Sequence, residues 1–123
     1  MRFVWWGAYA APYVLTHWQA LEVRNAIRLK AFRGEVTAAQ MARSISAFEQ
    51  DIATGRWQRP AYTAAVIEQK ADELSANYSA TLGCRTLDLI HVAAALVLGT
   101  KEFITFDGRQ GALAKKVGWV VRP

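Results

Sequence analysis

Apolar and polar positions alternate along the first half of this chain in segments that begin and end at recognisable residues. The stretches "THWQ" (16–19) and "TAAQ" (37–40) each place a Thr three residues before a Gln. This is the spacing of a capping box, in which each of the two side chains accepts a backbone amide hydrogen at a helix start. The first box predicts a helix from about His17 to Arg33 that ends at Gly34, and the second predicts a helix that ends near 54–55.

The second half of the chain continues with helices and short apolar runs. The spacing of apolar residues predicts helices over about 61–81 and 87–98, and Thr86 stands where it can cap the second of them. A last short helix is predicted after Asp107, which can cap it. The short extended runs are "PYVL" (12–15), "RWQRP" (56–60), "EFITF" (102–106) and "WVV" (119–121).

Helices joined to short apolar strands are typical of an α/β fold with a mainly parallel sheet, and this is the fold class that the pattern predicts. A helical α+β arrangement is the alternative, because the strands are few. With 123 residues, the chain is predicted to form a single domain, 1–123, that buries a core of its own.

Composition narrows the partners and the compartment. The chain is 53% hydrophobic and 20% charged, as in ordinary soluble proteins, and its single cysteine, Cys84, excludes an internal disulfide and favours a reducing cytoplasm. A formal net charge of +5 suits a polyanion such as RNA. The apolar start "MRFVWWGAYAAPYVL" is too short for a membrane span and predicts a buried segment, with a secretion signal as the lesser alternative.

One carboxylate of the first predicted helix lies at the edge of an apolar stripe. Trp18, Leu21, Asn25 and Leu29 share this stripe at spacings of three and four, and Glu22 lies beside it. Pairing of Glu22 with a nearby Arg is the simpler explanation, so this residue alone indicates little.

Two further carboxylates, Asp88 and Asp107, stand in very apolar surroundings. Asp88 falls in the first turn of "LDLIHVAAALVL", where the helix dipole favours an acid by about 0.3–1 kcal/mol, and Asp107 directly follows "FITF". Because ligands of an open parallel sheet gather where strands end and helices begin, Glu22, Asp88 and Asp107 are predicted to converge. Three carboxylates need a cation, and oxygen ligands favour Mg²⁺ or Mn²⁺, which can activate water against a phosphodiester.

The stretch "TLDLIHVAAALVLGTKEFITFDGRQGALAKKVG" (86–118) resembles the C-terminal half of PIN domains, especially the VapC-type toxins of bacterial toxin–antitoxin pairs. "LTHWQALEVRNAIRLKAFRGEVT" (15–37) resembles the segment with that family's second acidic residue. The resemblance implies a three-layer α/β/α fold and a Mg²⁺- or Mn²⁺-dependent endoribonuclease, with RNA and an antitoxin-like peptide as possible partners.

The resemblance also implies roles for particular residues. The family's acidic metal ligands and catalytic groups correspond to Glu22, Asp88 and Asp107. Four neighbours are expected to contact the substrate, namely Arg85, Thr86, Thr105 and Arg109.

The chain departs from the family at its start. PIN domains begin with a strand that carries the first catalytic Asp, whereas residues 1–15 contain no acid, so the chain resembles a member truncated at its N-terminus. Three readings stay open: a ribonuclease that holds its metal with three carboxylates, a non-catalytic oligomeric binding module for an antitoxin-like peptide or RNA, and a structural protein whose acids only cap helices. A missing central strand would leave backbone groups and apolar surface uncovered, which predicts a homodimer or higher oligomer.

Overall fold

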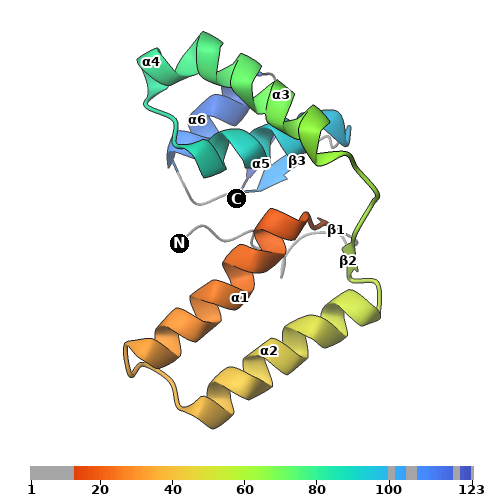
Figure 1. Cartoon of the computed structure of the whole chain (residues 1–123), viewed down its shortest axis with the longest axis vertical. Coiled ribbons are helices and arrows are strands. Elements are labelled where there is room, and N and C mark those ends of the chain that lie inside the picture. Colours follow the sequence, from red (N-terminus) through yellow and green to blue (C-terminus); the bar gives the residue numbers. More distant parts are fainter. Residues whose placement is uncertain (1–12, 100–101, 105–107, 118–119, 123) are drawn as a thin grey trace. The chain divides into compact units, whose positions relative to one another are not determined.

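The computed structural model describes residues 13–99, 102–104, 108–117 and 120–122, and the side chains of 14–99 and 111–117 (Figure 1). The described residues are mostly helical. They divide into two compact units, one up to Pro60 and one from Ala61 onward. The predicted buried N-terminal run lies almost wholly outside the described residues, and the prediction of a single domain stays a prediction.

Unit 1 consists of a helical hairpin between two short strands. Strand β1 (Tyr13–Val14) leads into α1 (His17–Phe32), and α2 (Ala38–Ala53) leads into β2 (Trp57–Gln58). The two strands pair in parallel, with Tyr13 opposite Trp57, and the Leu15 amide donates to the carbonyl of Gln58 at 2.8 Å. Figure 1 shows α1 and α2 joined by a tight connection below the strand pair.

Both predicted capping boxes are confirmed. Thr16 and Thr37 each accept the amide hydrogen of the Gln three residues later, at 3.2 and 3.1 Å. The two Gln side chains in turn accept the Thr amide hydrogens at 2.9 and 2.8 Å. The connection between the helices turns at Gly34, whose φ of +74° is a backbone conformation that favours glycine.

A small aromatic cluster closes the hairpin of unit 1. The rings of Phe48 in α2 and Trp57 in β2 are both buried and meet edge to face, with their centroids 6.5 Å apart. The guanidinium of Arg24 in α1 lies over the Phe48 ring at 5.6 Å and donates to Glu49 at 2.6 Å. These contacts determine which face of α1 turns toward α2.

Unit 2 is built on two packed helices. Helix α3 (Ala64–Leu74) continues through one π-helical segment, Ser75–Ser79, into α4 (Ala80–Leu82), and it packs against α5 (Thr86–Val97). The core consists of apolar residues on facing sides of the helices, namely Ile67, Ala71 and Leu74 in α3, Leu89, Val92, Ala93 and Ala94 in α5, and Leu113 and Ala114 in α6. The sequence predicted one helix over 61–81 but not its π-helical segment.

The remaining elements of unit 2 form a short βαβ segment. Strand β3 (Glu102–Ile104), helix α6 (Gly108–Lys116) and strand β4 (Val120–Arg122) follow in order, and β3 pairs with β4 in parallel with Phe103 opposite Val121. The predicted strands in "EFITF" and "WVV" and the predicted last helix are therefore confirmed.

The predicted α/β fold with one mainly parallel sheet is wrong. The strands are two or three residues long, and in the described residues they form two separate pairs, β1 with β2 and β3 with β4. Each short extended segment pairs with one other strand, and the capped segments between them form helices. The sequence pattern indicated the order of strands and helices correctly, but it does not determine which strands join in one sheet.

The resemblance to PIN domains is wrong for the same reason. A three-layer α/β/α fold needs a continuous central sheet with helices on both faces, and the described residues form two small pairs in a mostly helical structure instead. The view of the chain as a truncated family member loses its basis. The homodimer expected from a missing central strand loses that argument as well, and it stays a prediction.

Candidate functional site

The predicted metal ligands are divided between the two units and the part of the chain outside the described residues. Glu22 lies in α1 of unit 1, where it is half-buried, whereas Asp88 lies in α5 of unit 2. Asp107 lies outside the described residues. Among the residues that the structure describes, no group of three His, Cys, Asp or Glu side chains could hold a metal ion. Metal-dependent RNA cleavage through these residues stays a prediction from the sequence.

Asp88 has a clear structural role at the start of α5. Its side chain is 0% exposed, and one carboxylate oxygen accepts the Arg85 amide hydrogen at 3.1 Å. The Arg85 Nε atom lies 3.6 Å from the same oxygen. Helix α5 begins one residue earlier than predicted, so Thr86 is its first residue and Arg85, not Thr86, is its N-cap. Asp88 thus reaches back to its own helix start, as the simpler explanation of its position predicted.

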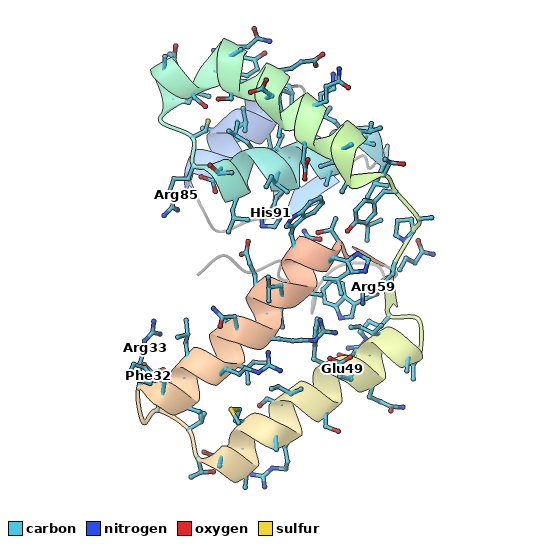
Figure 2. The ribbon with its side chains drawn as sticks, in the orientation of Figure 1. Phe32, Arg33, Glu49, Arg59, Arg85 and His91 are labelled. Atoms are coloured by element: carbon cyan, nitrogen blue, oxygen red, sulfur yellow. The ribbon has the colours of Figure 1, made fainter. Side chains whose placement is uncertain are left out.

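The four residues expected to contact substrate are not gathered into a described site either. Arg85 and Thr86 are both exposed at the start of α5. Arg109 belongs to α6, where its side chain is not described, and Thr105 lies outside the described residues. His91, one turn beyond Asp88, is buried on α5 and shown in Figure 2.

The most unusual described surface is on α1, on the side that α2 does not cover. Leu21, Asn25, Arg28 and Phe32 follow one another at spacings of four, three and four, and Leu29 lies beside them; we call these five residues the outer face of α1. Leu21 is 61% exposed, Leu29 38% and Phe32 86%. The row from Leu21 to Phe32 extends over about 16 Å of helix.

The hairpin contacts hold the outer face away from α2. Arg24 is bound by Glu49 and packs over Phe48, so the Arg24 side of α1 meets α2, and Arg28, one turn further along, lies at the edge between that side and the outer face. The hydrogen bond from Arg24 lowers the pKa of Glu49, and the positive charges of Arg24, Arg59 and Arg28 lower it further, although burial opposes them. Glu49 is therefore a carboxylate at neutral pH and keeps its partner.

The outer face combines apolar side chains with positive charge. Arg28 lies within the row, and Arg33 directly follows Phe32 at the C-terminal end of α1, where Figure 2 shows the two together. Within the described ranges, neither Arg28 nor Arg33 has a carboxylate within ion-pair distance. Lys30, by contrast, lies 3.8 Å from Glu35.

The outer face of α1 was partly predictable from the sequence. The stripe of Trp18, Leu21, Asn25 and Leu29 has the spacing of the outer face, but only Trp18 is half-buried, and the others are exposed. The sequence did not show that this stripe stays uncovered, because α1 also carries apolar residues on its other side. Phe32 was missed, although it lies eleven residues after Leu21, three helical turns along the same row.

No described helix has the length and apolar character that a bilayer crossing needs. The chain was also compared with models of protein families, with curated proteins and with solved structures, and none of them matches it. No family match therefore supports the resemblance to PIN domains, and the candidate site stands on its own geometry.

Proposed function

We propose that this chain is a protein-binding module that uses the outer face of α1. The observation that carries this proposal is the exposure of three large apolar side chains, Leu21, Leu29 and Phe32, on one side of α1, in a row that also contains Asn25 and Arg28. Single exposed apolar residues are ordinary, whereas several on one side of a helix, mixed with polar residues, are typical of an interaction surface.

The energetics favour a partner on this row. Burying a Leu or Phe side chain gains about 1.5–3 kcal/mol relative to leaving it in water. Phe32 is the most exposed large apolar residue described, so it has the most to gain. The composition also fits, because aromatic residues and Arg are enriched where proteins bind one another. A row of about 16 Å is short, and it corresponds to one partner helix and a modest affinity.

The test begins with selection of helical peptides from a displayed library against the purified full chain. Enriched peptides are then measured by fluorescence anisotropy with the wild type, Leu21→Ser and Phe32→Ser. We expect both substitutions to weaken binding at least tenfold, the loss of about 1.4 kcal/mol that a buried apolar contact supplies. Thermal unfolding should change little, by less than about 0.5 kcal/mol, because both side chains are exposed.

Val66→Ser is the matched control. Val66 is 49% exposed on α3 of unit 2, so the control removes an exposed apolar side chain that does not belong to the outer face of α1. Its peptide affinity should equal that of the wild type. The proposal fails if no peptide is enriched, or if the selected peptides bind Leu21→Ser and Phe32→Ser as well as they bind the wild type. It also fails if the chain instead binds RNA through Arg28 and Arg33 without regard to Leu21 and Phe32.

A further inference from the structure

We infer that the partner of the outer face is an acidic amphipathic helix, whose apolar side chains cover Leu21, Leu29 and Phe32 and whose carboxylates face Arg28 and Arg33. This inference rests on the proposed function and adds the chemistry of the partner. Its basis is the sign and the position of the charges around the apolar row.

The charges of α1 fall into two groups. Arg24 is engaged by Glu49 at 2.6 Å and Lys30 lies 3.8 Å from Glu35, so the hairpin already compensates these two. Arg28 and Arg33 have no carboxylate within ion-pair distance among the described residues. Arg28 acts on Glu49 only through the weakest of the attractions that lower the pKa of that carboxyl. An incoming partner therefore meets two available guanidinium groups.

The positions of these groups set the pattern of the partner. Arg28 lies between Leu21 and Phe32 in the row, and Arg33 lies just past its end. Arg33 lies five positions after Arg28, which corresponds to about 7.5 Å along the helix axis and about 140° around it, so the two residues flank the apolar row on different sides. A partner helix with one carboxylate on each flank of its apolar stripe can reach both groups, and its apolar residues at spacings of three and four then face Leu21, Leu29 and Phe32.

The same charges disfavour other occupants. A second copy of the chain docked face to face would bring two Arg28 residues into one interface, and the outer face contains no acid to compensate them. A nucleic acid would satisfy Arg28 and Arg33, and an unpaired base could stack on Phe32, but neither phosphates nor paired bases would cover Leu21 and Leu29. An acidic amphipathic helix satisfies both kinds of side chain.

The test uses three synthetic helical peptides with identical apolar residues at the spacings of the outer face and with Glu, Gln or Lys at the flanking positions. Affinities for the full chain are measured by fluorescence anisotropy. We expect the Glu peptide to bind about fivefold more tightly than the Gln peptide, as two exposed ion pairs allow, and the Lys peptide to bind weakest. Raising the salt from about 50 to about 300 mM should reduce this preference.

Arg28→Glu and its matched control, Arg43→Glu, assign the preference to the outer face. Both variants change the net charge equally, but Arg43 lies on α2 and is exposed there. Arg28→Glu should remove the preference for the Glu peptide, and Arg43→Glu should keep most of it. Circular dichroism of both variants establishes that the helices are retained.

Each result then has a definite meaning. Equal binding of the Glu and Gln peptides, lost in Phe32→Ser, overturns the acidic partner and leaves the protein-binding function standing. If Arg43→Glu removes the preference for the Glu peptide as fully as Arg28→Glu does, the preference does not arise from the outer face, and that assignment is overturned. If no peptide binds and the chain instead binds anionic vesicles through Phe32, both this inference and the choice of a protein partner are overturned. The same holds if no peptide binds and sedimentation shows self-association that depends on Phe32.

Discussion

Burial raises the pKa of the Cys84 thiol above its ordinary value, and the negative charge of Asp88 raises it further. A hydrogen bond with Ser79 acts in the opposite direction and lowers the pKa. Because the thiolate is the form that reacts, Cys84 is expected to be a slow nucleophile at neutral pH. Asp88 therefore has two roles as a single residue: it accepts a hydrogen bond at the start of α5, and its charge raises the pKa of Cys84.

Two substitutions should move the reactivity of Cys84 in opposite directions. Asp88→Asn removes the negative charge, lowers the pKa of Cys84 and speeds its alkylation by iodoacetamide at about pH 8. Ser79→Ala removes the hydrogen bond that favours the thiolate, raises the pKa of Cys84 and slows the reaction. The measurement is the alkylation rate of the folded protein across a series of pH values.

The opposite signs are the control in this experiment. Asp88 is buried, so Asp88→Asn can also loosen the fold and expose Cys84, and this alone would speed alkylation. Loosening cannot explain a slower reaction in Ser79→Ala. If both variants reacted faster, general loosening would account for the rates, and the assigned electrostatic causes would be contradicted.

At the scale of elements, the link between α1 and α2 depends on the ionisation of Glu49. The Arg24 hydrogen bond lowers the pKa of Glu49 below its ordinary value of 4.5, so the folded carboxyl binds a proton less readily than the unfolded one. The stabilisation is therefore complete above the ordinary pKa and is lost as the pH falls through the lower, folded pKa. The hairpin of α1 and α2 should therefore be more stable in neutral than in acidic solution.

Glu49→Gln tests this dependence. The variant should melt at a lower temperature than the wild type at about pH 7, and the difference should shrink as the pH falls through the lowered pKa of Glu49. Thermal unfolding followed by circular dichroism gives the comparison. In an Arg24→Met background the same substitution should have a smaller effect, because Glu49 has lost its hydrogen-bond partner and keeps only the weaker attraction of Arg59 and Arg28. An equal effect of Glu49→Gln in both backgrounds would contradict the assigned link.

The helices were predictable because their signals are local. Each capping box is complete within four residues, so Thr16 with Gln19 and Thr37 with Gln40 indicated the helix starts without knowledge of the rest of the chain. Pairing of strands depends on contacts distant in the sequence, such as Tyr13 with Trp57, and no local pattern specifies them. The predicted sheet failed at that step.

The outer face of α1 was likewise predictable only in part. The stripe that contains Leu21 and Leu29 follows from helical period alone. Its exposure follows from which side of α1 meets Phe48 and Glu49, and these residues lie on the next helix, with Glu49 25 positions after its partner Arg24. The predicted metal site assumed that Glu22, Asp88 and Asp107 share one sheet edge; Glu22 and Asp88 lie in different units and Asp107 lies outside the described residues, so this site stays a prediction.

At the scale of the whole molecule, each unit buries its own set of apolar side chains. Unit 1 has Phe48 and Trp57 near its strand pair, and unit 2 has Ile67 and Val92 between α3 and α5. A domain of this length usually unfolds in one step. Because the two sets of buried residues are separate, we expect a destabilising substitution in one set to lower the stability mainly of the helices that pack on that set.

Ile67→Ala tests this separation. Ile67 is 0% exposed, so its truncation should cost unit 2 about 3 kcal/mol, whereas Val66→Ala at the exposed neighbouring position should cost less than about 0.5 kcal/mol. Hydrogen exchange read by mass spectrometry should show faster exchange in α3 and α5 of Ile67→Ala and unchanged exchange in α1 and α2. Equal acceleration in all four helices would show that the two units unfold as one. A binding experiment on the outer face would then have to be carried out with stability monitored throughout the chain, since a change in unit 2 would reach α1.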